Sequence, residues 1–174
     1  MTEHEFTLVI DGDLADERLA AALFEVGCDD ATFGVSDGIG YGEFIREAST
    51  LAEAVMSAIH QVETVASLRV MHLEPDDIVS MADIAERLER TRESVRLLIA
   101  GRRGPGHFPP PFSHSRERSR LWRWSDVAEW LGDIEPEERE AARFTAAVNA
   151  ALELRHRLAQ MADEIAAKEL VSLV

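Results

Sequence analysis

Arginine is the residue whose number and spacing most clearly indicate chemistry in this chain of 174 residues. Ten of the eighteen basic residues are arginines between positions 87 and 123, where three glutamates oppose them, so this segment carries +7. Because the whole chain carries −15, the remaining residues carry −22. Guanidinium groups bind phosphate and carboxylate through parallel hydrogen bonds, so the segregated charge indicates an anionic partner for this segment. Nucleic acid is the first candidate.

Two short helices are predicted to hold the first of these arginines. Ser80 and Asp83 have the spacing of a capping box, and apolar residues recur at helical spacing from Met81 to Leu88. Thr91 is placed to cap a second helix, whose apolar residues face inward. Two short helices joined by a tight turn are typical of a helix-turn-helix. In that motif, the first turn of the second helix reads base edges in the major groove.

The residues expected to contact DNA form two groups. Those on the second helix face the groove, where an arginine paired with guanine contributes about 1–3 kcal/mol of discrimination. Those in the following loops meet phosphates, which supply affinity but little sequence information. The first group is Thr91, Arg92, Glu93, Ser94 and Arg96, with base discrimination assigned to Arg92, Ser94 and Arg96; the second is Arg102, Arg103, Arg116, Arg118 and Arg120.

Residues 79–131 contain short motifs in a fixed order. The second helix ends in Ile99-Ala-Gly101, a Phe108-Pro-Pro-Pro111 segment follows, and the stretch closes with Trp122-Arg-Trp-Ser-Asp-Val-Ala-Glu-Trp-Leu131. This stretch, under a third of the chain, resembles the winged helix-turn-helix of the excisionase-like, MerR-related family. The resemblance implies a DNA-binding domain with a wing after the second helix. Ser125 is expected to cap a last short helix.

The first 74 residues are predicted to form a small α+β domain. Apolar residues alternate, as they do in strands, at residues 6–10, 31–35, 39–45 and 68–72. Helical spacing recurs at residues 19–26 and 51–62. Asp37-Gly38 fits a two-residue hairpin turn, and Ser49 or Thr50 caps the second helix. The order βαββαβ is that of the ferredoxin-like unit, with both helices on one side of an antiparallel sheet.

The polar break Glu74-Pro75-Asp76-Asp77 divides this domain, residues 1–74, from the DNA-binding domain, residues 75–132. Residues 133–174 are predicted to form one long helix from Pro136 to about Leu170. Its apolar positions follow a coiled-coil seam: Phe144, Ala147, Ala151, Leu154, Leu158, Met161 and Ile165. About 33 residues would span about 50 Å, too long to bury on a small domain, so we expect the helix to join two copies. The alternative is that it folds back over its own domains.

The sequence lacks the residue patterns of catalytic and metal-binding sites. The six histidines have no ligand spacing, and Cys28 has neither a paired base nor a second cysteine. Asp11-Gly-Asp13 is expected to be a turn, because the oxygen ligands of a calcium loop do not continue after it. We therefore expect no catalytic residue, no metal and no cofactor. The three tryptophans are expected in the core rather than as base-stacking platforms: Trp122, Trp124 and Trp130.

The sequence thus predicts an α+β protein with a ferredoxin-like domain, a winged helix-turn-helix and a long C-terminal helix. Its expected function is sequence-specific transcriptional regulation, as a homodimer on double-stranded DNA. No apolar run approaches the roughly 20 residues of a membrane span, and the first residues lack the order of a signal peptide, so we expect a cytoplasmic protein without membrane contact.

The alternative is an antitoxin or similar interaction protein that covers a partner protein and autoregulates through the same motif. A recombination-directionality factor is a third hypothesis. The operator, and activation versus repression, are left open.

Overall fold

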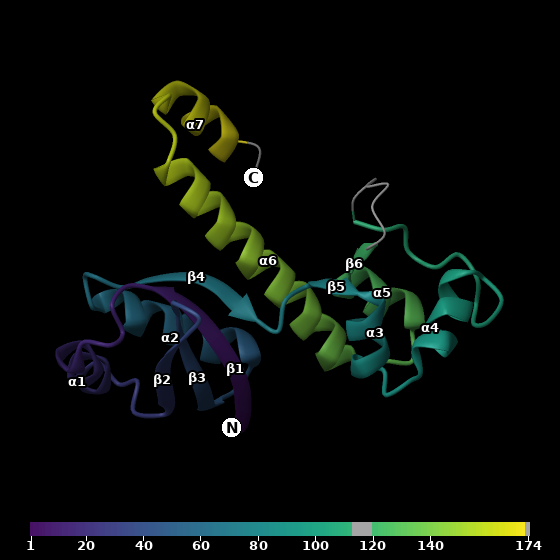
Figure 1. Ribbon diagram of the computed structural model, residues 1–174, viewed down its shortest axis with the longest axis horizontal. Coiled ribbons are helices and arrows are strands. Elements are labelled where there is room, and N and C mark those ends of the chain that lie inside the picture. Colours follow the sequence, from purple (N-terminus) through teal and green to yellow (C-terminus); the bar gives the residue numbers. More distant parts are fainter. Residues whose placement is uncertain (113–119, 173–174) are drawn as a thin grey trace. The chain divides into compact units, whose positions relative to one another are not determined.

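The structure is a computed structural model that describes residues 1–112 and 120–172 (Figure 1). The described part of the chain is α+β, with seven helices and a four-stranded antiparallel sheet. Contacts divide the chain into two compact units: unit 1 comprises Met1–Pro75 and Ala147–Val174, and unit 2 comprises Asp76–Ala146. Residues 133–174, which the sequence grouped as a single element, are therefore shared between the two units.

The sheet of unit 1 is built from β1 (Thr2–Asp11), β2 (Ala31–Ser36), β3 (Ile39–Ala48) and β4 (Arg69–Glu74). Its strand order is β2-β3-β1-β4, and every neighbouring pair is antiparallel. The predicted hairpin turn is present: Asp37 and Gly38 both have positive φ, 51° and 79°. A turn with two positive φ angles matches the right-handed twist of the strands that it joins, which explains why the hairpin closes in two residues.

Two helices cover one face of this sheet, α1 (Glu17–Glu25) and α2 (Leu51–Thr64). Thr50, one of the two predicted caps, accepts a hydrogen bond from the backbone N–H of Glu53 and begins α2. The buried face of β1 meets the buried face of α2, so the core of unit 1 lies between sheet and helices. Arg46 of β3 points into the same layer, where it pairs with Asp30 at 2.6 Å and donates to the Ser57 hydroxyl.

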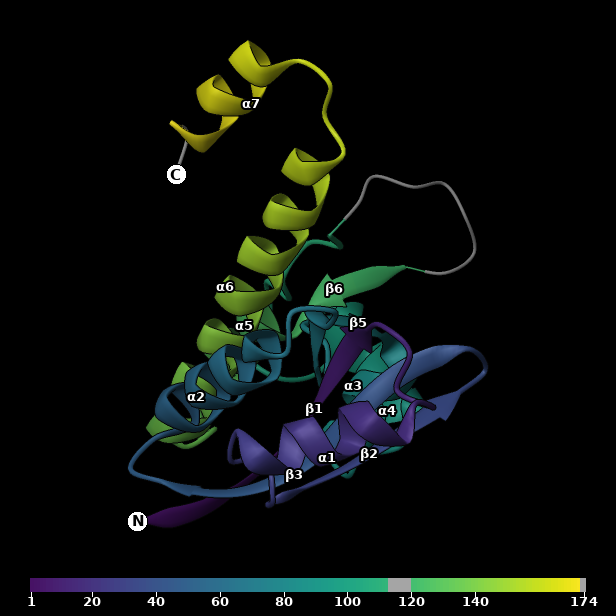
Figure 2. The same cartoon turned by 90° about the vertical axis from the view of Figure 1, so that its left-hand side faces the viewer.

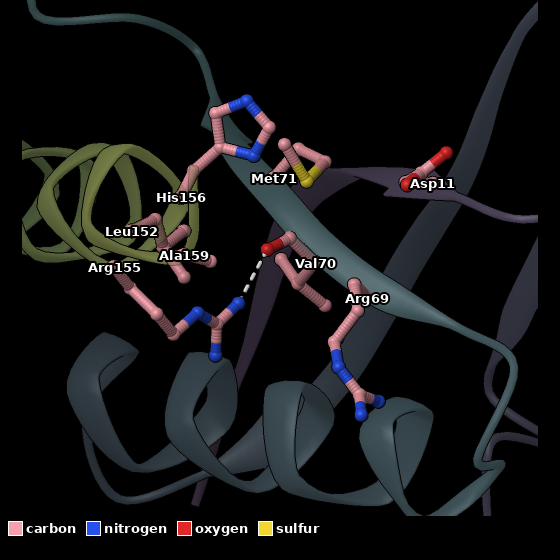
Figure 3. A pocket seen from close by; sticks show the side chains of 8 residues that line it. All are labelled: Asp11, Arg69, Val70, Met71, Leu152, Arg155, His156 and Ala159. Atoms are coloured by element: carbon pink, nitrogen blue, oxygen red, sulfur yellow. Dashed lines mark hydrogen bonds between the residues drawn. The ribbon is translucent and has the colours of Figure 1, made fainter. Parts of the chain in front are cut away.

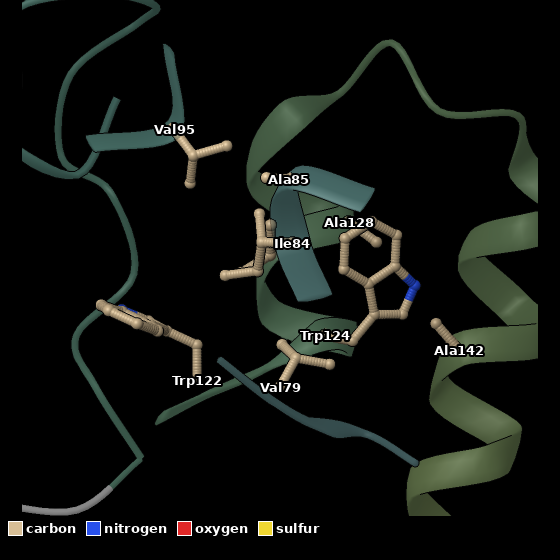
Figure 4. Packing of buried hydrophobic residues seen from close by; sticks show 9 residues of the cluster. Val79, Ile84, Ala85, Val95, Trp122, Trp124, Ala128 and Ala142 are labelled. Carbon is tan, nitrogen blue, oxygen red and sulfur yellow. The ribbon is translucent and has the colours of Figure 1, made fainter. Parts of the chain in front are cut away.

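Unit 2 contains β5 (Ile78–Ser80), α3 (Met81–Arg87), α4 (Arg92–Ile99), β6 (Leu121–Arg123), α5 (Trp124–Leu131) and the first part of α6 (Pro136–Ala159). β5 and β6 pair as a two-stranded antiparallel sheet. The core collects buried apolar side chains from all of these elements: Val79, Ile84, Ala85, Val95, Trp122, Trp124, Val127, Ala128 and Ala142 (Figure 4). Trp122 and Trp124 are thus core residues, as predicted, whereas Trp130, the third predicted core tryptophan, is half-buried.

The prediction of one continuous helix to about Leu170 is wrong. α6 ends at Ala159, and a separate helix, α7, runs from Glu164 to Val171 after a change of chain direction (Figures 1 and 2). Asp163 explains the break, because its side chain accepts hydrogen bonds from the backbone N–H groups of Ile165 and Ala166 and caps α7. A short carboxylate that binds its own neighbouring backbone favours a helix start over a helix interior, although no proline or glycine is present.

The second half of α6 lies along the edge strand β4 of unit 1. Asn149 accepts from the backbone N–H of Leu73 at 2.8 Å and donates to the backbone carbonyl of the same residue at 2.9 Å. Arg155 donates to the Val70 carbonyl at 2.6 Å, and Glu63 accepts from the Val70 N–H at 3.0 Å. Side chains therefore satisfy the backbone groups that an edge strand leaves free.

Candidate nucleic-acid interface

Local capping fixes the α3–α4 pair. The predicted capping box is present at the start of α3, since Ser80 accepts from the Asp83 N–H and the Asp83 carboxylate accepts from the Ser80 N–H at 2.7 Å. The hydrogen bond that the Asp83 carboxylate accepts from the Ser80 backbone lowers the pKa of Asp83 from its usual value. Thr91 accepts from the Ser94 N–H and begins α4. Between the helices, Glu89 adopts a positive φ of 50°, which lets the chain reverse in a short turn.

α4 has a buried face and an exposed face, as its sequence predicts. Val95 and Leu98 are buried against the core of unit 2. Arg92 and Arg96 are exposed, and Ser94 is half-buried. The arginines therefore extend from the surface of unit 2 on a helix whose opposite side is held by packing.

Glu93 and Arg96 form an ion pair on this exposed face. Nε and Nη2 of Arg96 donate to the two carboxylate oxygens of Glu93 at 2.7 and 2.6 Å. The hydrogen bond from Arg96 lowers the pKa of Glu93, and the nearby charge of Arg102 acts in the same direction. Arg102 lies in the loop directly after α4, where its backbone N–H donates to the Leu97 carbonyl at 2.9 Å.

The loop after α4 is anchored to α5 by aromatic contacts. Trp130 donates from its indole Nε1 to the Gly106 carbonyl at 2.7 Å, and its ring contacts Phe108 with the centroids 4.8 Å apart. Gly104 has a φ of 72°, and a side chain there would meet Leu98 and Trp130. This part of the loop is therefore ordered by the core, with Arg102 and Arg103 exposed beside it.

The arginines predicted to contact phosphates are only partly described by the structure. Arg102, Arg103 and Arg120 are exposed. Arg116 and Arg118 lie outside the described residues. The grouping of these residues into base and phosphate readers stays a prediction.

Two arginines of the basic segment have structural contacts that the sequence did not reveal. Arg87 donates to the Asp76 carbonyl at 2.7 Å and lies 5.1 Å from the ring centroid of Trp124. Burial lowers the pKa of Arg87, as expected for a cation removed from water. Arg123 lies over the Phe112 ring at 4.6 Å and 3.8 Å from the Asp77 carboxylate.

The prediction that Ser125 caps α5 is wrong. The helix begins at Trp124 with Arg123 in the cap position, so Ser125 lies inside the first turn. Asp77 takes over the capping role from a distant part of the chain. Its carboxylate accepts from the Ser125 N–H at 2.8 Å, and its backbone carbonyl accepts from the Trp124 N–H at 2.7 Å. Asp77 is only 4% exposed and joins β5 to α5.

Unit 1 holds a small pocket of about 200 Å³ between β4 and α6 (Figure 3). Arg155 borders it, but its guanidinium already forms a bidentate pair with Glu63, at 2.9 and 2.7 Å. The pocket is smaller than the roughly 300–1,000 Å³ of most ligand sites, and we assign no ligand to it. Within residues 1–112 and 120–172, no cluster of three His, Cys, Asp or Glu side chains is arranged to hold a metal ion.

Comparison with known proteins adds no relative: no family model, curated protein or solved structure gives a significant match to the chain. Among the helices described, none is both long enough and apolar enough to cross a membrane.

Proposed function

We propose that unit 2 binds double-stranded DNA as a winged helix-turn-helix, with α4 in the major groove and the segment between α4 and β6 as the wing. The protein would act as a sequence-specific transcriptional regulator in the cytoplasm, as a homodimer. The ferredoxin-like arrangement of unit 1 belongs to the same proposal, which the strand order β2-β3-β1-β4 supports.

The observation that carries this proposal is the placement of charge on α4. The helix buries its apolar side in unit 2, while Arg92 and Arg96 extend outward and Arg102 and Arg103 follow directly in the anchored loop. A helix held by its apolar face, with arginines on the face that remains, is the arrangement that presents base-reading side chains to a groove. The strongly negative remainder of the chain repels DNA and confines contact to this surface.

The test begins with selection of bound duplexes from a random pool, followed by titration of the enriched duplex in fluorescence anisotropy. Arg96→Ala should reduce the preference for the enriched sequence, because it removes a base contact. Arg103→Ala should weaken binding to every duplex and reduce the salt dependence by about one counterion, because it removes a phosphate contact. Arg157→Ala, an exposed arginine on α6, is the control and should change neither. The proposal is wrong if the protein binds no duplex at low salt. It is also wrong if the three variants show the same sequence preference and the same salt dependence.

A second candidate function, covering a basic partner protein as an antitoxin does, is favoured by the sheet face that α1 and α2 leave open. Glu3 of β1 lies directly opposite Glu47 of β3, and like charges in this register destabilise a sheet. Glu5 and Glu43 are also exposed on this face, beside Ile45, whose exposed fraction is 56%. Carboxylates around an exposed apolar side chain complement a basic protein surface.

Co-expression with the product of a neighbouring small gene tests this second function. If that product is toxic and the chain suppresses it through the open sheet face, Glu43→Lys with Glu47→Lys should abolish suppression. DNA binding should change no more in this variant than in a control variant with the same change of net charge. Glu137→Lys with Glu138→Lys, at the exposed start of α6, is the matched charge control. Equal suppression by both double variants would exclude the sheet face as the contact surface.

A further inference from the structure

Glu93 holds one particular edge of the Arg96 guanidinium. A guanidinium has five N–H donors, and the carboxylate takes one from Nε and one from Nη2. One N–H of Nη1 and the second N–H of Nη2 are left side by side on the end edge, and the other N–H of Nη1 points back toward the aliphatic part of the side chain. Both side chains are more than half exposed, 53% for Arg96 and 62% for Glu93, so this edge is accessible from solvent.

The free edge has the donor pattern that guanine requires. Guanine presents O6 and N7 in the major groove, and an arginine reads both with two parallel hydrogen bonds. A guanidinium already fixed by one carboxylate loses less conformational freedom when its other edge binds. The same carboxylate repels phosphate, so it also disfavours the competing contact of Arg96 with the DNA backbone.

We infer that Glu93 is a positioning residue that holds Arg96 for guanine, and that the preferred duplex contains a guanine at the base pair facing Arg96. This inference rests on the proposed DNA-binding function. Arg92, one turn earlier, has no ion pair with any residue that the structure describes. Arg92 is therefore free to contact either a base or a phosphate, whereas Arg96 is committed to a single orientation.

Glu93→Gln tests the inference, because it keeps the shape of the side chain but removes its charge and one of its two acceptors. Glu86→Gln is the matched control, since Glu86 is exposed on α3 and makes no side-chain hydrogen bond with a described residue. The probes are the duplex enriched by the wild-type protein and the same duplex with the essential guanine replaced. Affinities are measured by fluorescence anisotropy at one salt concentration.

The two variants should behave differently. Both remove one negative charge, so both should bind the guanine-replaced duplex more tightly than wild type does. Only Glu93→Gln should lose preference, with the affinity ratio between the two duplexes falling by about fivefold or more, the lower end of the range for one arginine–guanine pair. In the free protein, the NMR signal of the Arg96 Nε–H group should move in Glu93→Gln and stay in place in Glu86→Gln.

The outcomes separate this inference from the proposed function. If the wild-type protein enriches no sequence, the proposed function fails and the inference fails with it. If the wild-type protein enriches a guanine-containing duplex but Glu93→Gln keeps the wild-type affinity ratio, only the positioning role of Glu93 is overturned. An enriched duplex in which replacing each guanine has no effect also overturns it, and leaves the DNA-binding function standing.

Discussion

The arginines between residues 87 and 123 differ in what surrounds them, although their formal charges are the same. Arg87 is half-buried against the indole of Trp124 and bonded to a backbone carbonyl, so its role is to close the core of unit 2. Arg92, Arg96 and Arg103 are exposed and free of such contacts with the core. Net charge alone therefore overstates the number of cations that this segment offers to a partner.

Replacing Arg87 by alanine should destabilise unit 2 rather than act through DNA contact. The variant loses a charged hydrogen bond to the Asp76 carbonyl and a cation–π contact, and the free energy of unfolding should fall by about 2 kcal/mol. Urea denaturation followed by tryptophan fluorescence measures this change. Arg90→Ala, an exposed neighbour, is the control and should stay within about 0.5 kcal/mol of wild type. Equal stability of the two variants would contradict a structural role for Arg87.

At the scale of elements, side chains cover β4, which is an edge strand of the sheet in unit 1. Asn149 pairs with both backbone groups of Leu73 as a neighbouring strand would, and Glu63 with Arg155 satisfies both backbone groups of Val70. An uncovered edge strand can pair with another chain, so this cover opposes aggregation.

Asn149→Ala should uncover one position of this edge. Two backbone groups of Leu73 lose their partners, which should cost about 1–3 kcal/mol if water does not replace them. Hydrogen exchange measured by NMR should show faster exchange of the Leu73 amide. In Asn149→Asp, which keeps the acceptor, the amide should exchange more slowly than in Asn149→Ala. An unchanged Leu73 amide in the alanine variant would show that α6 does not protect the strand.

The predicted seam of α6 lies on a different face from the one that the fold buries. Val148 and Leu152 are the buried residues of the helix within unit 1, whereas Ala147 and Ala151 are exposed and Leu154 is half-buried. The exposed alanines leave part of this apolar stripe available for a second copy and would allow close approach, whereas Leu158 is half-buried and lines a hollow together with residues of α7. α7 begins after this stripe, and Ile165 falls on that separate helix.

Leu154→Asp with Leu158→Asp should convert a dimer that uses this face into a folded monomer, because two carboxylates would be buried in the interface. Light scattering coupled to size-exclusion chromatography measures the mass, and circular dichroism checks that the helices are retained. Glu153→Ala with Arg157→Ala removes only an exposed ion pair on the same helix and should leave the mass unchanged. A wild-type protein that is monomeric at high micromolar concentration would remove the seam prediction.

Sequence reasoning succeeded where the signal is local. The capping box at Ser80, the cap at Thr91 and the turn at Asp37-Gly38 each depend on residues within four positions of one another. It failed where partners are distant: Asp77 caps α5 from 48 residues away, and Asn149 covers β4 from 76 residues away. For the candidate site, periodicity predicted the exposed face of α4. The burial of Arg87 depends on Trp124, which no local pattern indicates.

At the scale of the whole molecule, unit 1 is discontinuous in sequence, because unit 2 lies between its two parts. Residues 1–75 contain the four strands and Glu63 but lack Asn149 and Arg155, the other two side chains that cover β4. A chain in which residues 1–75 are joined by a flexible linker to residues 147–172 should therefore keep Leu73 protected. A fragment of residues 1–75 alone should expose this edge and associate. Analytical ultracentrifugation of both proteins measures association, and hydrogen exchange measures protection of the Leu73 amide. A fragment that stays monomeric and protects this amide would contradict the prediction.

The same discontinuity sets an order of events on the ribosome. The backbone groups of Leu73 stay uncovered until Asn149, which is 76 residues further along the chain, has been synthesised. At typical synthesis rates of about 5–20 residues per second, this interval is roughly 4 to 15 s. During that time all of unit 2 is synthesised, and it can fold before the sheet that precedes it is covered. The N-terminal strands of this protein are thus made first and completed last, and their exposed edge is then a natural point of contact for chaperones.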